Sequence, residues 1–147
     1  MAEHLSADTS VVSRLTKISE DSKAYQGILR DRRLAVSFQV RAELLGANFQ
    51  GQQRQRVSDL LAATLVLPHA ESTDVWYAPT VEKRKELKRA GQPGRDASDA
   101  DAWVLSSAMG YGLPLLSHDM QQVHLGRACG LRVLTNLPAL RDGNPRI

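Results

Sequence analysis

We predict an α/β fold in which a single domain is built around a parallel sheet of about five strands. Short apolar runs alternate along the chain with longer segments of helical periodicity, which is typical of parallel strands joined by helices. The length of 147 residues favours one domain over 1–147, with its core at about 5–135 and a C-terminal tail at 136–147. Hydrophobic residues make up 42% of the chain, which is enough for a compact globule.

The first third of the chain is predicted to contain two strands and three helices. Residues 5–7 form a weak first strand, because they carry almost no β-branched side chains. Residues 8–15 combine a turn and an N-cap with the start of a helix, and residues 21–30 form a second helix. The apolar run 34–36 is the second strand, and a serine-capped helix follows over 37–47.

The middle of the chain is predicted to be mostly helical. Residues 50–63 form a helix whose first half is polar and whose second half faces the core. Residues 64–67 are the clearest strand in the sequence. Residues 73–90 form one helix or two, with Pro79 interrupting the first or opening the second. The run 91–94, Gly-Gln-Pro-Gly, is the strongest loop signal in the chain.

The last third is predicted to hold two more helices and two more strands. A helix covers 98–109 and is ended by Gly110 and Gly112. It is apolar nearly all round, so we expect it to be buried. A strand over 113–116, a helix over 120–128 and a strand over 132–134 complete the alternation.

Composition limits the classes of function. No apolar run approaches the ~20 residues needed to cross a bilayer, and the N-terminus has neither a basic start nor an apolar stretch. Cys129 is the only cysteine, so an internal disulfide is impossible and a cytoplasmic location is expected. The net charge of +3 is compatible with a polyanionic substrate. P-loop and serine-hydrolase motifs do not occur in the sequence.

Acidic residues recur where a predicted strand gives way to a helix, or in the first turns of that helix. In an open α/β sheet these positions converge above the carboxyl ends of the strands, where ligands bind. At an effective dielectric near 20, two unit charges ~4 Å apart repel by about 4 kcal/mol. Such a cluster takes up protons or holds a hard cation such as Mg²⁺ or Mn²⁺. The residues are Asp8, Glu43, Asp101 and Asp119.

Each acid also has a purely structural interpretation. Asp8 and Asp119 are suited to N-capping the helices that follow them. Asp101 and its neighbour Asp99 lie in a first helical turn, where the helix dipole favours acids. Glu43 is either a site residue or a rim glutamate whose stem packs, because it lies on the same side of its helix as the apolar residues Val40, Leu44 and Ala47.

Two basic stretches are candidate RNA-binding surfaces, although solvated helix faces are an equally simple interpretation. Aromatic residues at 76–77 either stack on unpaired bases or pack in the core. Among the histidines, only His118 adjoins a candidate site acid. The basic candidates are Arg30, Arg32, Arg33, Lys83 and Arg84.

Taken together and in order, the acidic settings resemble the motifs of the PIN-domain family, and most closely those of VapC-type toxins of bacterial toxin–antitoxin modules. The likeness extends from Asp8 to Thr135. Each motif alone is weak, and the ordered set is fairly specific. The motifs are Asp8-Thr9-Ser10, Ala42-Glu43-Leu44-Leu45-Gly46, Asp101-Ala102-Trp103-Val104 and Ser117-His118-Asp119.

This resemblance implies a three-layer α/β/α fold with the parallel strand order 3-2-1-4-5. It implies a type II toxin that acts as a Mg²⁺- or Mn²⁺-dependent ribonuclease, cleaving RNA by metal-activated water. It also implies a homodimer and a cognate antitoxin whose C-terminal segment lies across the active-site groove. Asp8 and Asp101 correspond to direct metal ligands, and Glu43 and Asp119 act directly or through water. The accessory residues are Thr9, Ser117 and Asp99, the last without a firm family counterpart.

Two other classes compete with the nuclease. A catalytically inactive PIN-like module would bind RNA or protein and keep its acids as helix caps. A weak first strand and the absence of an aromatic residue shortly after Asp119 favour this alternative. A receiver or a haloacid-dehalogenase-like phosphatase fits less well. The receiver requires an acid ending the third strand, where this chain has Pro68, and the phosphatase requires Asp-x-Asp, where the third residue is Ser10.

Overall fold

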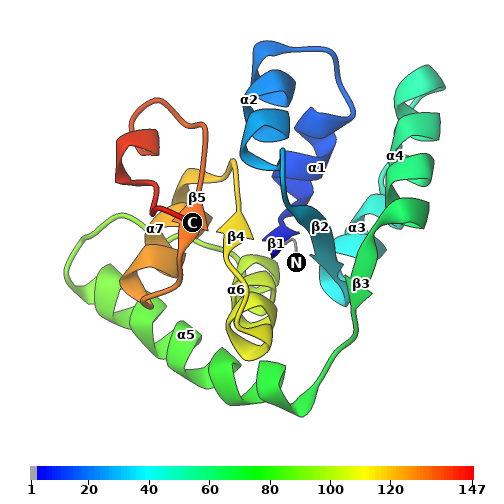
Figure 1. Ribbon diagram of the computed structural model, residues 1–147. Helices are drawn as coiled ribbons and strands as arrows, with labels where there is room; N and C mark the ends of the chain where they lie inside the picture. Colours follow the sequence, from blue (N-terminus) through cyan, green and yellow to red (C-terminus); the bar gives the residue numbers. More distant parts are fainter. Residues whose placement is uncertain (1–2) are drawn as a thin grey trace.

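The computed structural model describes residues 3–147, and within this range a single parallel sheet forms the centre of the molecule (Figure 1). All neighbouring strands pair in parallel, in the order β3-β2-β1-β4-β5. This order confirms the one that the family resemblance implies. The strands are β1 His4–Ala7, β2 Arg33–Ser37, β3 Leu65–Leu67, β4 Leu115–Leu116 and β5 Val133–Leu134.

Helices connect the strands and cover the sheet. The α5, α6 and α7 helices contact one another, and α6 also packs on α3. The α1 helix contacts α2 and α3 (Figure 1). No helix in the described part of the chain is long and apolar enough to cross a membrane. The helices are α1 Thr9–Leu15, α2 Glu20–Ile28, α3 Phe38–Gly46, α4 Gly51–Ala63, α5 Glu71–Arg89, α6 Asp99–Tyr111 and α7 Met120–Ala128, with a short 3-10 helix at Arg141–Gly143.

Burial explains how the weak first strand forms. β1 lies between β2 and β4, and its residues Leu5, Ser6 and Ala7 are fully buried. Strand propensity depends on the fit of a residue to its neighbours in the sheet, so a central position overrides the lack of β-branched side chains. The amide of Ser6 also donates to the Pro114 carbonyl (2.9 Å), which extends the ladder towards β4.

The structure shows α5 as a single helix, one of the two predicted alternatives, and places the end of α6 at Gly112, the second of the two predicted glycines. α5 is one helix through Pro79, whose ring lies on the exposed side, while Thr80 is buried and donates its hydroxyl to the Trp76 carbonyl (2.8 Å). α6 passes through Gly110 and ends at Gly112, which adopts the left-handed conformation (φ 66°). Gly110 serves a different purpose, because a Cβ there would lie 2.9 Å from the backbone of Ser72 in α5. The glycine therefore permits close packing of α5 against α6.

Smaller differences concern the ends of elements. β4 and β5 are shorter than predicted, and residues 136–147 pack against the domain. In that segment, the Asn144 side chain bonds the backbone of Thr135 in both directions. Ala47, expected to be buried, is exposed because α3 ends at Gly46 and the chain leaves in an extended conformation.

Candidate functional site

Asp8 is the most buried of the candidate acids. It follows β1, caps α1, and is only 5% exposed. The Ser10 hydroxyl donates to Oδ2 of Asp8 (2.8 Å), and the Ser10 amide lies at 3.4 Å from the same oxygen. Burial raises the pKa of Asp8 to about 6, the Ser10 hydrogen bond partly opposes this rise, and the negative charge of Asp101 adds to it. Asp8 therefore holds a proton about half of the time at pH 6, where an ordinary aspartate is ionised.

Asp101 lies in the first turn of α6 and forms a capping box with Ser98. The Ser98 amide donates to Oδ2 of Asp101 (2.9 Å), and the Asp101 amide donates to the Ser98 hydroxyl (3.0 Å). Burial raises the pKa of Asp101, and the charges of Asp119 and Glu43 raise it further. The structural interpretation of Asp101 as a helix-start residue is thus correct. Its carboxylate also interacts electrostatically with the other candidate acids.

Glu43 joins α3 to α1. The Thr9 hydroxyl donates to one carboxylate oxygen of Glu43, and the Gln39 side chain donates to the other (3.1 Å). This places Thr9, the hydroxyl that follows Asp8 in the sequence, between two of the acids. The glutamate is half-buried and held by both oxygens, so it does not extend freely into solvent as a rim residue would.

Asp119 caps α7 and is supported by a buried pair of polar side chains. The Gln122 amide donates to Asp119 (3.0 Å), and the Asp119 amide donates to the Ser117 hydroxyl (3.1 Å). The Ser117 hydroxyl in turn donates to the side-chain oxygen of Gln122 (2.6 Å). The side-chain nitrogen of Gln122 donates to the Asp101 carbonyl (3.4 Å). Ser117 is fully buried beneath the site, so its role in the structure is to fix the turns of Asp119 and Asp101.

The strand order brings the four acids to one end of the sheet. Asp8 follows β1, Asp119 follows β4, and β1 and β4 are hydrogen-bonded neighbours, which lie about 5 Å apart in a sheet. Glu43 comes from the helix after β2, on the other side of β1. Asp101 completes the group through the first turn of α6, the helix that leads into β4.

The chemistry of these side chains fits a hard divalent cation, because carboxylate and hydroxyl oxygens are the ligands such ions prefer. The spacing is more open than a closed metal site. Among the described residues, no three His, Cys, Asp or Glu side chains are close enough together to hold an ion. The acids also accept hydrogen bonds from their own turns. Asp8 and Asp101, for example, each use Oδ2 to cap a helix.

Asp99 lies apart from this group. Its carboxylate forms an ion pair with Arg84 of α5 (2.7 Å), and its side chain is 74% exposed. Arg84 also donates to the Ala97 carbonyl (2.9 Å). The pair ties the start of α6 to α5, which accounts for both residues without a role in chemistry.

The remaining basic candidates do not gather around the acids either. Arg30 and Arg33 are exposed where the chain enters β2, at the opposite edge of the sheet from the acids. Arg32 donates to the Ile147 carbonyl (2.7 Å) and so holds the C-terminus. Lys83 pairs with Glu86 one turn along α5 (2.9 Å), and this pairing raises the pKa of Lys83.

The aromatic residues at 76–77 have different environments. Tyr77 stacks on Trp103 of α6, with ring centroids 3.7 Å apart, so it packs within the protein. Trp76 is 42% exposed on the outer face of α5.

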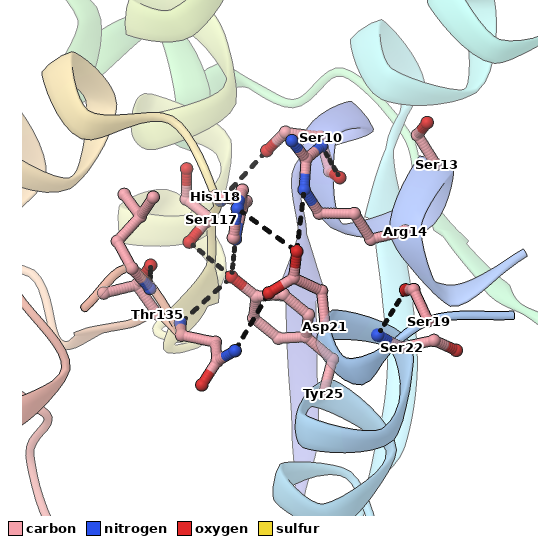
Figure 2. A network of polar contacts seen from close by, with 12 residues as sticks. Ser10, Ser13, Arg14, Ser19, Asp21, Ser22, Tyr25, Ser117, His118 and Thr135 are labelled. Carbon is pink, nitrogen blue, oxygen red and sulfur yellow. Dashed lines mark hydrogen bonds and ion pairs between the residues drawn. The ribbon is translucent and has the colours of Figure 1, made fainter. Parts of the chain in front are cut away.

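A polar network beside Asp8 was missed by the sequence analysis (Figure 2). The hydroxyl of Tyr25, a fully buried residue of α2, lies 2.6 Å from Nδ1 of His118 and accepts the Asn136 amide (3.0 Å). The His118 amide donates to the Ser10 hydroxyl (3.0 Å), the same group that holds Asp8. Ser10 therefore links the end of β1 to the turn that follows β4.

Arg14 and Asp21 form the outer part of the network (Figure 2). Arg14 Nη1 donates to the Ser10 carbonyl (3.1 Å), and its Nε lies 3.9 Å from Asp21. Asp21 accepts the Asn136 side chain (3.0 Å) and lies 3.8 Å from Nε2 of His118. Burial lowers the pKa of His118 and the charge of Arg14 lowers it further, while the charge of Asp21 partly opposes this shift. The one sequence signal was Tyr25, because a buried phenol requires a polar partner.

The parallel α/β sheet and the acids at its carboxyl end indicate an α/β domain with a ligand site, and the comparison with family models identifies the family. The model of the PIN domain matches residues 7–128. The chain therefore belongs to the PIN-domain family.

Solved structures show the same fold at low sequence identity. VapBC2 from Rickettsia felis, bound to a DNA fragment from its promoter, has a TM-score of 0.66 at 15% identity, covering 90% of this chain and 98% of that chain. DNA-bound VapBC from Salmonella typhimurium gives 0.64 at 19%, covering 92% and 98%. VapBC-1 from nontypeable Haemophilus influenzae gives 0.63 at 21%, covering 90% and 97%. No match was found among curated protein sequences.

Proposed function

We propose that this protein is a divalent-metal-dependent endoribonuclease that acts in the cytoplasm as the toxin of a type II toxin–antitoxin pair. The observation that carries the proposal is the mutual effect of the acids at one end of the sheet. Burial raises the pKa of both Asp8 and Asp101; the charge of Asp101 adds to the rise at Asp8, and the charges of Asp119 and Glu43 add to the rise at Asp101, which supports a site that takes up a proton or a cation. A protein that only required helix caps would have no reason to bury carboxylates against one another.

In this proposal Asp8 and Asp101 hold Mg²⁺ or Mn²⁺ directly, and Glu43 and Asp119 hold it directly or through water. When bound, the cation supplies Lewis-acid stabilisation at the phosphodiester and favours ionisation of an attacking water. Because Asp8 ligates as the carboxylate, cation binding would displace the proton from the fraction of Asp8 that carries one. Ser10 and Thr9 orient the carboxylates of Asp8 and Glu43 for this purpose.

The remaining residues of the site hold the acids in place. Ser117 and Gln122 fix the turn that carries Asp119 and support the backbone of Asp101. A bound cation would reduce the repulsion between the carboxylates, whose spacing is open in its absence.

The proposed partners follow from the structural neighbours. The Rickettsia, Salmonella and Haemophilus proteins are VapBC complexes, which supports an antitoxin partner for this chain. We also propose that the protein is a homodimer. RNA is the proposed substrate.

RNA cleavage in Mg²⁺ and in EDTA tests the proposal. Wild-type protein should cleave RNA only with the metal, and Asp8→Asn and Asp101→Asn should abolish cleavage. Full activity in EDTA, or undiminished cleavage by both variants, would contradict it.

A catalytically inactive PIN-like module that binds RNA or protein is the second candidate. The observation that favours it is the lack of three acids close enough to hold an ion in the described residues, together with the capping roles of Asp8, Asp101 and Asp119. Mn²⁺ titration by calorimetry separates the two. Absence of binding at millimolar metal favours the inactive module.

A further inference from the structure

RNA faces an electrostatic barrier at the candidate site. Its phosphates must approach a group of carboxylates, and like charges repel. A positively charged side chain beside the acids would offset this repulsion and hold the RNA strand in place. The basic residues predicted from the sequence do not serve this purpose. Arg30 and Arg33 lie at the opposite edge of the sheet, and Lys83 and Arg84 are paired with acids.

Arg14 lies at the carboxyl end of the sheet, where the acids are, and is hydrogen-bonded to the turn that carries Asp8. It is one helical turn beyond Ser10 in α1, and its Nη1 bonds the Ser10 carbonyl (3.1 Å). The Ser10 hydroxyl contacts both Asp8 and the His118 amide. Figure 2 shows the guanidinium beside Ser10 and above Asp21, on the same side of the network as His118.

The guanidinium of Arg14 is held in place by the protein but keeps hydrogen-bonding capacity for a ligand. Its only acidic contact among the described residues is Asp21, at 3.9 Å, and the two side chains are 36% and 40% exposed. A pair this long and this exposed is weak. In the part of the chain that the structure describes, Nη2 makes no hydrogen bond. A phosphate could therefore take this nitrogen, and the planar guanidinium suits two parallel bonds to phosphate oxygens.

The network behind Arg14 fixes the position of its acidic contact. Asp21 is held by the Asn136 side chain (3.0 Å), and the Asn136 amide bonds the buried Tyr25 hydroxyl (3.0 Å). Asp21, Tyr25 and Asn136 come from α2 and from the segment after β5, so segments distant in sequence cooperate to define one surface position. This arrangement is more elaborate than a solvated surface arginine requires.

We infer that Arg14 is a substrate-binding residue whose guanidinium binds a backbone phosphate of single-stranded RNA, next to the phosphodiester at the acidic site. Asp21 is its positioning residue. The inference rests on the proposed function, because it assumes that RNA lies along the carboxyl end of the sheet. It adds a contact that specifies where the strand runs, from Asp8 towards α1 and α2.

Binding of a fluorescently labelled single-stranded RNA tests the inference. The experiment uses an Asp8→Asn/Asp101→Asn background in EDTA, so that cleavage cannot occur and carboxylate repulsion is reduced. Adding Arg14→Gln should weaken binding about tenfold, the value of one charged hydrogen-bonded contact. It should also reduce the slope of log K against log salt by about 0.7, as expected for the loss of one phosphate contact on a single strand. Arg14→Lys should keep the slope and recover part of the affinity.

Arg30→Gln is the matched control, because it removes the same charge from an exposed arginine at the opposite edge of the sheet. It should change affinity less than twofold. Equal losses in Arg14→Gln and Arg30→Gln would show that only net charge matters, and would overturn the inference, as would no loss in Arg14→Gln. If Arg14→Gln does not fold, the Nε–Hε NMR signal of Arg14 in the background protein replaces it. That signal should shift on RNA addition, and an unmoved signal overturns the inference.

The two proposals fail separately. Metal-dependent cleavage by the wild type together with equal binding by Arg14→Gln and Arg30→Gln would leave the nuclease standing and remove the Arg14 contact. Lack of cleavage by the wild type, with Arg14-dependent binding retained, would remove the nuclease and leave an RNA-binding surface at Arg14.

Discussion

The carboxyl end of the sheet and the outer surface of α5 treat their charged side chains in opposite ways. Along α5, Lys83 pairs with Glu86, Lys85 with Glu82, and Arg84 with Asp99 of α6. At the carboxyl end of the sheet, the acids are grouped with one another, and Asp8 and Asp101 have raised pKa values as a result of burial first and of the charges of neighbouring acids second. Paired surface charges contribute little to stability, and grouped buried acids reduce it. Charges that a fold leaves unbalanced indicate a ligand site better than charges that are merely numerous.

The largest expected effect separates Asp101 from Asp99, two acids in the same helical turn. Asp101→Asn should reduce metal-dependent RNA cleavage at least about 100-fold, because a ligand oxygen and a negative charge are lost. Asp99→Asn is the control, since its carboxylate pairs with Arg84 away from the site, and should retain activity within about twofold. Initial rates in Mg²⁺ provide the measurement. Similar losses in both variants would show that the helix start, and not the acidic group, controls activity.

The second prediction concerns the stability cost of Asp8. Its pKa is about 6 in the folded protein against an ordinary value of 3.8, so between these values of pH folding takes up a proton. Below pH 4 both states are protonated and no penalty applies. As pH rises from 4 to 6, the unfolded chain ionises first and the folded state loses stability, and above pH 6 the full penalty of about 3 kcal/mol is reached.

Asp8→Asn should therefore stabilise the metal-free protein by about 1–3 kcal/mol at pH 7 and by little at pH 4, because asparagine keeps the N-cap. Urea unfolding in EDTA at both values of pH measures the difference. A variant that is less stable than the wild type at pH 7 would contradict the burial and repulsion assigned to Asp8.

A smaller effect is expected at Ser10, whose hydroxyl joins Asp8 to the His118 amide. Ser10→Ala should lower the free energy of unfolding by about 1 kcal/mol and cleavage by about tenfold, because it loosens the carboxylate and leaves the His118 amide unpaired. Ser13→Ala, in the same helix, should change neither by more than about 0.5 kcal/mol or twofold. Chemical denaturation and initial rates would reveal the difference, and equal behaviour of the two variants would argue against a link through Ser10.

The smallest effect is expected on α5. Lys85→Gln breaks an exposed pair with Glu82 and should shift the unfolding temperature by no more than about 1 °C, with cleavage unchanged. Differential scanning calorimetry and the same cleavage assay provide the comparison. A clear loss of cleavage would mean that RNA crosses α5 and that the contrast between the two regions is wrong.

The positions of the main candidate acids in the fold were predictable, because local sequence signals place them. Asp8 and Asp119 follow strands and cap helices, and Asp101 follows a capping serine, so strand and cap patterns locate them. The sequence also located all five strands, although it overestimated the length of β4 and β5. Those short strands owe their limits to neighbouring main-chain partners, which no local pattern encodes.

What was missed depends on contacts between distant residues. Tyr25 and His118 lie 93 positions apart, and the pairing of Arg84 with Asp99 depends on how α5 packs against α6. The basic runs illustrate the same limit, because the sequence shows where the charges are and not which acids neutralise them. For a related reason, the sequence left open whether Pro79 divides its helix. A proline on the exposed side of a helix that is packed on α6 leaves that helix intact.

Calorimetric titration of Mn²⁺ into the wild type and Asp8→Asn at pH 6 tests most directly whether the grouped acids form a cation site. Performed in two buffers of different ionisation enthalpy, it also counts protons. We expect the wild type to bind Mn²⁺ at or below millimolar concentration and to release about half a proton, the fraction that Asp8 holds near its pKa of about 6, with both signals lost in Asp8→Asn. No binding by the wild type at millimolar Mn²⁺, or equal binding and proton release by the two proteins, would contradict it.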